Sequence, residues 1–372
     1  MEHWGGGEEF LVNLANNVKD YEFIIVSSTG EPLRVFEQNN IKTVEVKSLK
    51  KYYQQGGSWT LYTKLKIVFN IIITTFKMIG VILNYRIDMV LANGNFAGIY
   101  GFLAAAITKR KFIAVQHLIY KSDSTEAKIL KLLDRYSAKL VCISNSVYEN
   151  VKSILGDNSE NVLVIPHGIE LPEIKIIENK RETINIGIVG SIIRLKAIDI
   201  IINSAMELIF QNRNIHLHIF GSVRKDEADS IEYEKELIKL IVDNNLSDNI
   251  HFRGFEKSKY KIYNDLDIVI NYSSMPESFS FTVLEAMSFG KIVIASDVGG
   301  PKELISNNEN GFLIPPTNEI ALKKMLEFCI PHLYSSEFSE IRKRARKTAE
   351  EKYSLKRFSS DYTIFFDSIL SS

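Results

Sequence analysis

The stretch DIVINYSSMPESFSFTVLEAMSFGKIVIAS, residues 267–296, decides the fold. It begins with a β-branched apolar run, continues through a polar loop into a segment of helical period that we expect to begin near Ser280, and ends in a second apolar run. Strands that are apolar along their whole length and alternate with helices are typical of a parallel sheet covered on both faces. The stretch therefore predicts an α/β unit with the polar loop at the mouth of its sheet.

The same alternation runs along the chain in two series. The expected strands of the first series are EFIIVS, DMVLA, FIAVQ, KLVCIS and NVLVIP, beginning at residues 22, 88, 112, 139 and 161. Those of the second are INIGIVG, IHLHIFG, NIHFRGF, DIVINY and KIVIAS, beginning at 184, 215, 249, 267 and 291. We therefore expect two facing Rossmann-like domains, 1–166 and 167–354, with an interdomain cleft and with the last helix, 355–372, joining the first domain.

The composition is that of a globular protein large enough for two cores. Of the 372 residues 45% are hydrophobic, and Lys plus Arg equals Asp plus Glu at 45 each. This balance provides no global positive field, so we do not expect nucleic acid to be a partner. Cys142 and Cys329 both lie in apolar runs, which argues against a disulfide framework and, with no secretory leader evident, favours a cytoplasmic protein.

The most apolar segment, residues 68–83, is short for a membrane span and contains polar residues. We expect it to form a helix buried in the first domain. The basic residues of this region leave open a second interpretation, in which the first domain rests on an anionic surface at the inner face of the cell membrane. These basic residues are Lys64, Lys66, Lys77 and the run at 109–111.

Two glutamates flank the start of the helix expected near Ser280. Glu277 lies in the preceding loop, and Glu285 lies inside the helix among apolar residues. A helix N-terminus carries unpaired N–H groups and a partial positive charge of about half a unit, which suits a phosphate, while carboxylates accept hydrogen bonds from sugar hydroxyls. The simpler alternative is that both glutamates are solvated, although a carboxylate among core residues needs a partner.

The segment PESFSFTVLEAMSFGKIVIASDVGGPKELI, residues 276–305, resembles the signature region of family 4 glycosyltransferases. The resemblance extends through GFLIPP (311–316), VIPHGIE (164–170) and VGSIIRLKAIDIIINSA (189–205). It implies the GT-B architecture and a retaining transfer of sugar from a nucleotide-diphosphate donor to a glycan or lipid-linked acceptor, with no metal or other cofactor. It also implies a role in the synthesis of bacterial capsule, lipopolysaccharide or other envelope polysaccharide.

The resemblance assigns roles in the second domain. It implies that Glu277 contacts hydroxyls of the transferred sugar, that Glu285 contacts the ribose, and that Lys196 neutralises the departing pyrophosphate. The other donor-binding residues that it implies in this domain are Gly190, Arg194, Gly221, Phe255, Phe281 and Thr282. Arg194 is included because Ser191 stands where many relatives have the phosphate-binding arginine.

In the first domain the resemblance covers a glycine loop and a strand end. Gly6 and Gly7 are expected to face donor and acceptor, and His117 is expected near the anomeric carbon, as a catalytic residue with Glu277 and Lys196. The stretch from Asn93 to Asn95, which closes the preceding strand, is a candidate acceptor contact. Relatives enter the glycine loop from a β-strand, whereas only MEHW precedes it here, so this strand is expected to be lost or truncated.

Asp265-Leu266-Asp267 imitates the D-x-D sequence with which other glycosyltransferases bind a divalent metal. Asp267 opens an expected strand at its amino end, away from the mouth of the sheet, so we expect a structural role and no metal site.

Three alternatives stay open at this stage. A nucleotide-sugar epimerase or hydrolase on the same fold would act on the donor alone. A catalytically weak binding subunit would account for the short N-terminus and for Ser191 and Ser280 at positions where relatives have other residues. A retaining glycosidase with two close carboxylates fits less well, because glutamates beside a phosphate-binding helix suit a nucleotide better than a polymer.

Overall fold

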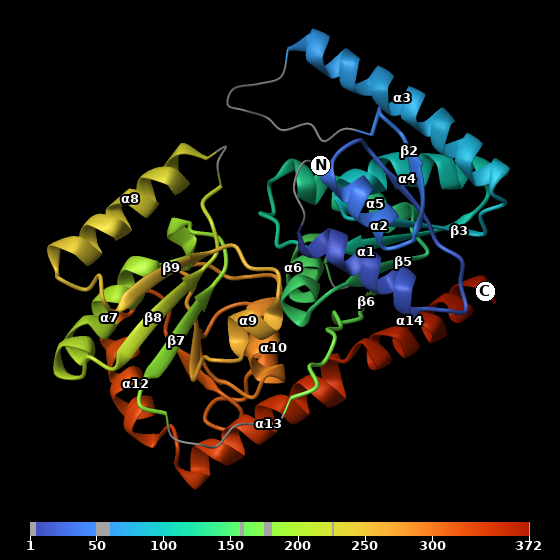
Figure 1. Ribbon diagram of the computed structural model, residues 1–372. Coiled ribbons are helices and arrows are strands. Elements are labelled where there is room, and N and C mark those ends of the chain that lie inside the picture. Colours follow the sequence, from blue (N-terminus) through green and yellow to red (C-terminus); the bar gives the residue numbers. More distant parts are fainter. Residues whose placement is uncertain (1–4, 50–59, 157–159, 175–180, 225–226, 372) are drawn as a thin grey trace. The chain divides into compact units, whose positions relative to one another are not determined.

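The computed structural model of the protein describes residues 5–49, 60–156, 160–174, 181–224 and 227–371 (Figure 1). The chain forms two compact units: unit 1 combines Met1–Gly168 with Leu355–Ser372, and unit 2 is Ile169–Ser354. The boundary follows Gly168, just beyond the expected position. Both units are α/β with parallel strands, as the alternation of apolar runs and helices predicts.

Unit 2 contains a parallel sheet of six strands in the order β12-β11-β10-β7-β8-β9. The strands are β7 Ile184–Val189, β8 Ile215–Phe220, β9 Ile250–Gly254, β10 Ile268–Asn271, β11 Ile292–Ser296 and β12 Phe312–Ile314. The direction of winding reverses between β7 and β10, which pair with Ile268 opposite Ile186. Ligands of doubly wound sheets bind outside the carboxyl ends of the strands at such a reversal, so this is where a site is expected.

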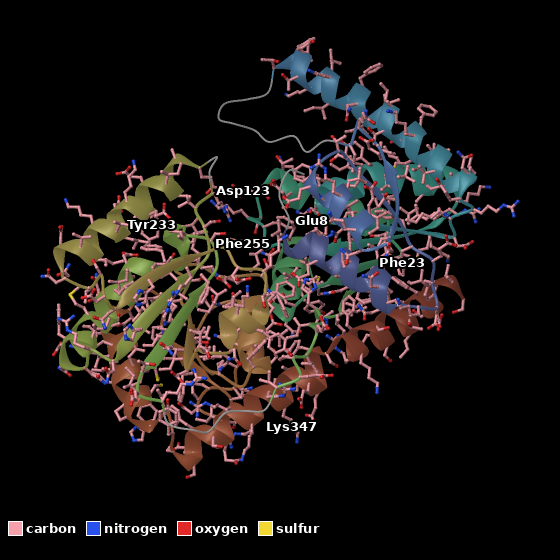
Figure 2. The ribbon with its side chains drawn as sticks, in the orientation of Figure 1. Glu8, Phe23, Asp123, Tyr233, Phe255 and Lys347 are labelled. Carbon is pink, nitrogen blue, oxygen red and sulfur yellow. The ribbon has the colours of Figure 1, made fainter. Side chains whose placement is uncertain are left out.

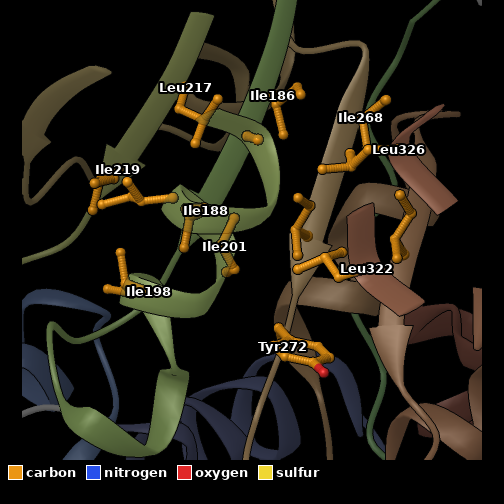
Figure 3. Packing of buried hydrophobic residues seen from close by; sticks show 14 of the residues in the cluster. Ile186, Ile188, Ile198, Ile201, Leu217, Ile219, Ile268, Tyr272, Leu322 and Leu326 are labelled. Carbon is orange, nitrogen blue, oxygen red and sulfur yellow. The ribbon is translucent and has the colours of Figure 1, made fainter. Parts of the chain in front are cut away.

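Side chains of this sheet alternate between two apolar clusters, one on each face. Figure 3 shows the first cluster, in which Ile186 and Ile268 pack with Leu322. Val269 and Leu284 belong to the second cluster. Burial on both faces explains why these strands are apolar at successive positions. The helical elements of unit 2 are η1 Arg194–Lys196, α7 Ile198–Gln211, α8 Ala228–Asp243, α9 Lys259–Tyr263, α10 Phe281–Ser288, α11 Pro301–Leu304, α12 Glu319–His332 and α13 Ser336–Tyr353.

Unit 1 has a four-stranded parallel sheet, β3-β4-β5-β6, and a parallel pair, β1-β2. The strands are β1 Ile24–Ser27, β2 Lys42–Glu45, β3 Met89–Asn93, β4 Lys111–Gln116, β5 Lys139–Cys142 and β6 Val162–Val164. The helices are α1 Gly6–Asn17, α2 Glu31–Gln38, α3 Leu61–Asn84, α4 Asn95–Thr108, α5 Thr125–Tyr136, α6 Asn145–Leu155 and α14 Leu355–Leu370. The C-terminal helix α14 packs on α1, where the ring of Phe10 lies 5.8 Å from that of Phe358.

The expectation that residues 68–83 form a buried helix is wrong. They belong to the longer helix α3, in which only 22% of the most apolar 18-residue window is buried. Phe69 and Phe76 are 65% and 69% exposed. Helix α3 packs on α4 through one face, whereas its opposite face is also apolar and stays exposed. By length and composition alone, α3 could cross a membrane.

The predicted loss of a strand before the glycine loop concerns residues 1–4, which lie outside the described residues.

Candidate functional site

The site in unit 2 is built on the carboxyl ends of neighbouring strands. Gly190 follows β7 and Gly221 follows β8, and their N–H groups donate to Phe220 O at 2.9 Å and to Gly254 O at 2.8 Å. Gly221 has a φ of +152°, and a Cβ at that position would lie 1.8 Å from Gly190 O. The two loops therefore approach each other this closely only because residue 221 is glycine.

Lys196 and Glu277 meet at the reversal between β7 and β10. Lys196 lies in η1, after β7, and its ammonium group forms a salt bridge with the Glu277 carboxylate in the loop after β10. Both side chains are about four-fifths buried, with exposures of 21% and 20%. Asn271 lies between them: its Oδ1 accepts from Lys196 Nζ at 3.3 Å, and its Nδ2 donates to Glu277 Oε2 at 3.3 Å. The Ser273 hydroxyl also donates to Glu277.

The groups around the Glu277 carboxylate determine its charge. Burial alone would raise the pKa of its carboxyl group. The charge of Lys196 and the hydrogen bonds from Lys196, Ser273 and Asn271 outweigh burial and hold the pKa below its ordinary value of 4.5. Glu277 is therefore an ionised acceptor at neutral pH, which is the state needed to bind hydroxyl groups.

The backbone of Glu277 is held by a second loop. Gly300 N donates to Glu277 O at 2.7 Å, and Gly299 forms an isolated parallel bridge with Glu277. Gly299 has a φ of +65°, and a Cβ on it would lie 2.4 Å from the Glu277 carbonyl oxygen. The glycine pair after β11 thus keeps Glu277 in place.

Helix α10 begins beside the same loop. Ser280 caps the helix by accepting from Val283 N, and Asn271 Nδ2 donates to the Ser280 hydroxyl at 2.8 Å. Thr282 Oγ1 donates to Val189 O, at the end of β7, at 3.2 Å. The first turn, which contains Phe281 and Thr282, therefore lies between the ends of β7 and β10. Amides of a first helical turn have no acceptor within the helix and favour an anion.

Glu285 is buried, and the expected partner of its carboxylate is present. The Tyr263 hydroxyl donates to Oε2 at 2.7 Å, and Lys259 Nζ lies 2.5 Å from Oε1. Both partners come from α9. The alternative that Glu285 is a solvated surface residue is therefore wrong, whereas its contact with ribose stays a prediction.

The side chains of two predicted donor-binding residues do not contact the Lys196–Glu277 pair. Arg194 forms a bidentate ion pair with Glu236 and a further pair with Asp229, both on α8, and its guanidinium lies 5.0 Å from the ring centre of Tyr233. The guanidinium of Arg194 is thus engaged with α8 and not with the Lys196–Glu277 pair. Phe255 directly follows β9 and is 70% exposed (Figure 2).

In unit 1 the structure brings together the glycine loop and two strand ends. Gly6 and Gly7 form the first turn of α1, and Asn93 Nδ2 donates to Gly7 O at 2.8 Å. Asn93 Oδ1 lies 2.5 Å from His117 Nε2. Because this amide oxygen is an acceptor, the neutral His117 ring carries its proton on Nε2. Burial lowers the pKa of His117 to about 4, so the ring is uncharged at neutral pH.

Sequence reasoning missed several residues that hold the predicted ones. Asn271 and Ser273 contact Glu277, Lys259 and Tyr263 contact Glu285, and the ring of His167 lies 5.6 Å from that of His117. A polar residue that ends an otherwise apolar strand, as Asn271 does, is a usable signal. No spacing in the sequence relates Lys259 or Tyr263 to Glu285.

The D-x-D sequence lies at the other end of the sheet. Asp267 Oδ2 accepts from Asn185 N at 2.8 Å, and Asp265 O accepts from Arg181. Within the described parts of the chain, no group of three or more His, Cys, Asp or Glu side chains could hold a metal ion.

Comparison with known families accounts for almost the whole chain. Residues 170–352 match the family described as glycosyl transferases group 1, and residues 4–173 match glycosyltransferase family 4.

Individual relatives agree with these matches. An uncharacterised glycosyltransferase of Methanocaldococcus jannaschii is 29% identical over 63% of this chain and 62% of its own length, so the chain spans less than two thirds of that relative. The capsular polysaccharide biosynthesis glycosyltransferase CapM of Staphylococcus aureus is 23% identical over 90% of this chain and 87% of CapM. The crystal structure of Anabaena HepE in complex with UDP superimposes with a TM-score of 0.80 at 19% identity, covering 99% and 98% of the two chains.

Proposed function

The chain is a glycosyltransferase of the family 4 type with the GT-B fold, and we propose that it moves a sugar, with retention of configuration, from a nucleotide-diphosphate donor to a hydroxyl group of a glycan or lipid-linked acceptor. The observation that carries this proposal is the Lys196–Glu277 pair at the reversal of the unit 2 sheet, beside the first turn of α10. The cation and the helix N-terminus suit the diphosphate of a sugar nucleotide, and the ionised carboxylate suits the hydroxyl groups of its sugar.

The pair changes partners when the donor binds. The diphosphate of the donor accepts hydrogen bonds from Lys196 Nζ and from the backbone amides of Phe281 and Thr282, in the first turn of α10. The Glu277 carboxylate, still held by Asn271 and Ser273, then accepts hydrogen bonds from hydroxyls of the transferred sugar. Lys196 and the α10 amides are already in position to stabilise the negative charge that develops on the leaving diphosphate. Such preorganised electrostatic stabilisation is the main source of catalysis in a site of this kind.

The transfer is a substitution on one face of the sugar. The bond between the anomeric carbon and the phosphate oxygen breaks, and the departing nucleoside diphosphate takes the electron pair. The acceptor oxygen forms its bond to the anomeric carbon on the same face and gives its proton to the departing phosphate oxygen. In this scheme no carboxylate acts as nucleophile, and Glu277 positions the sugar.

His117 serves the same reaction from unit 1. Its ring is held by Asn93, which is itself fixed by Gly7 O. An uncharged ring near the anomeric carbon can hydrogen-bond to the sugar without adding a positive charge beside a centre that becomes positive in the transition state.

The enzyme needs no metal in this scheme, since Lys196 and the α10 N-terminus supply the positive charge. A chelator is expected to leave turnover unchanged, and strong inhibition would contradict this part of the proposal.

We assign the enzyme to envelope polysaccharide synthesis in the cytoplasm, at the inner face of the cell membrane. The support is the name of CapM, which is a capsular polysaccharide enzyme, and the burial of both Cys142 and Cys329 as free thiols. The bound nucleotide of HepE makes UDP-sugars the first donors to test.

Two other functions use the same site. An epimerase or hydrolase would convert the sugar nucleotide without acceptor, whereas the transferase forms its glycoside product only when acceptor is added. A binding subunit with little activity would form no product with or without acceptor, and calorimetry that shows no binding of any common sugar nucleotide would support this alternative.

A screen of sugar nucleotides by thermal denaturation tests the proposal without knowledge of the acceptor. A donor at 100 times its dissociation constant adds about 2.7 kcal/mol to the free energy of unfolding. We expect stabilisation of the wild type and none of Lys196→Ala. Absence of stabilisation by every common sugar nucleotide would contradict the proposal.

A further inference from the structure

Helix α3 presents an apolar stripe to solvent. Large apolar side chains that are 48–76% exposed recur along its outer face, and at 3.6 residues per turn they span roughly 120° of the helix. These stripe residues are Leu61, Tyr62, Leu65, Val68, Phe69, Ile72, Phe76 and Leu83. A continuous exposed apolar surface of this kind marks a binding surface more often than chance exposure does.

The opposite face of α3 is fixed to unit 1. Thr74 is buried, and its Oγ1 donates to Ser48 O at 3.1 Å. The Tyr100 hydroxyl, on α4, donates to Asn70 Oδ1 at 3.3 Å. The stripe is therefore the outer side of a docked helix.

The charges of α3 are all of one sign. The helix contains no Asp or Glu, and its three lysines are exposed. On a helical projection Lys64 lies beyond one edge of the stripe, and Lys66 and Lys77 lie beyond the other. Lysines in such positions extend their ammonium groups away from the apolar stripe toward phosphate groups on either side of it.

We propose that α3 lies flat in the interface of an anionic lipid bilayer, with its apolar stripe at the acyl boundary and its lysines among the lipid headgroups. A spanning orientation is less suitable, because it would remove Asn70 and Thr74 from their partners in unit 1. A second copy of the chain is less suitable as well, since two identical stripes would bring lysines of like charge together without any acidic partner on the helix. The proposal names a partner of the proposed enzyme and does not require donor binding.

Vesicle flotation tests the proposal. The full chain is mixed with phosphatidylcholine vesicles that lack phosphatidylglycerol or contain it at roughly one lipid in three. We expect strong binding to the anionic vesicles, weak binding to the neutral ones, and weakening of the electrostatic part by high salt. Absence of binding to the anionic vesicles would overturn the proposal.

Two sets of variants separate the contribution of the lysines to vesicle binding from that of the apolar stripe. Lys64→Gln/Lys66→Gln/Lys77→Gln is expected to weaken binding on the order of a hundredfold, because each lysine near an anionic surface contributes roughly fivefold. Phe69→Ser/Phe76→Ser is expected to weaken it at least tenfold. Ile364→Ser, on α14 of the same unit, removes a side chain of matching exposure, 65%, and should bind as the wild type does.

Controls keep the outcome interpretable. Thermal melting and donor binding of each variant are expected to match the wild type, so a loss of vesicle binding is separate from any failure of the glycosyltransferase site. If Phe69→Ser/Phe76→Ser binds vesicles as well as the wild type, the stripe is not the membrane surface. If this variant instead converts a dimer into a monomer and no form binds vesicles, the partner is a second copy and the proposal is wrong.

Discussion

The ammonium group of Lys196 forms a salt bridge with the carboxylate of Glu277, 81 residues further along the chain. The pair lies where the winding of the unit 2 sheet reverses, so each residue follows a strand next to the other's. In the donor-free protein each charge is compensated by the other. In the proposed function, a sugar nucleotide supplies replacement partners for both charges, so that donor binding leaves no buried charge unpaired.

Substitutions in this pair are expected to affect the rate more than the fold. Lys196→Ala should lower turnover by roughly 10²–10³-fold, because it removes a preformed donor to the departing diphosphate. Glu277→Gln keeps the shape of the side chain and should also lower turnover strongly. Steady-state kinetics with thermal melts check both.

Lys323→Ala is the matched control for the pair. Lys323 forms an ion pair with Glu207 on the surface of unit 2, between α12 and α7. This variant should keep wild-type turnover. Wild-type turnover in Lys196→Ala as well would show that Lys196 is structural.

The partners of Glu285 should act on donor affinity. Tyr263→Phe removes the hydrogen bond to Oε2, and the loosened carboxylate is expected to weaken donor binding about fivefold to twentyfold, corresponding to about 1–2 kcal/mol. Tyr233→Phe removes a comparable hydrogen bond, to Asp199 at 2.5 Å, and should leave donor affinity unchanged. Equal effects of the two variants in titration calorimetry would contradict the assignment of Glu285 to the donor.

His117 is expected to stay neutral in mildly acidic solution. Burial lowers its pKa to about 4 from an ordinary 6.5, so the folded protein binds a proton less readily than the unfolded chain does. The stability that this neutral ring contributes is present above pH 6.5 and is lost as the pH falls from 6.5 toward 4. NMR titration should show no protonation of His117 at pH 5.5. Titration near pH 6.5 would mean that the ring is solvated.

Ala197, after η1, and Gly221, after β8, test the backbone around the candidate site of unit 2. Ala197 has a φ of +44°, in the left-handed region, where a β-carbon costs about 1–2 kcal/mol. Ala197→Gly is therefore expected to raise the melting temperature or leave it unchanged. Gly221→Ala, which places a Cβ 1.8 Å from Gly190 O, should lower it clearly. The reverse order of the two melting temperatures would refute this account of the loop.

Much of the fold could be predicted from the sequence because the central strands are buried on both faces. Strand β10, for example, is buried at all four positions and reads as an apolar run. Strand β2, Lys42–Glu45, was missed because its burial is only partial and its residues include Lys42 and Glu45. The exposure of α3 could not be predicted, because a helix that is apolar on both sides has the composition of a buried one.

The site was predictable only where the residues themselves are distinctive. Resemblance to a family identified Glu277, Glu285 and Lys196, and the structure brings Glu277 and Lys196 into contact. The position of Arg194 could not be predicted, because Asp229 and Glu236 take part through the packing of α8, which no local pattern encodes. Contacts between side chains of separate elements depend on tertiary structure, which a short motif does not specify.

The central claim is that Lys196 and the first turn of α10 bind the donor diphosphate while Glu277 binds the sugar. A crystal structure of the protein with a bound sugar nucleotide tests it most directly. We predict a phosphate oxygen within hydrogen-bonding distance of Lys196 Nζ and of the amides of Phe281 or Thr282, with sugar hydroxyls on Glu277. A diphosphate bound elsewhere, with the Lys196–Glu277 salt bridge intact, would contradict the claim.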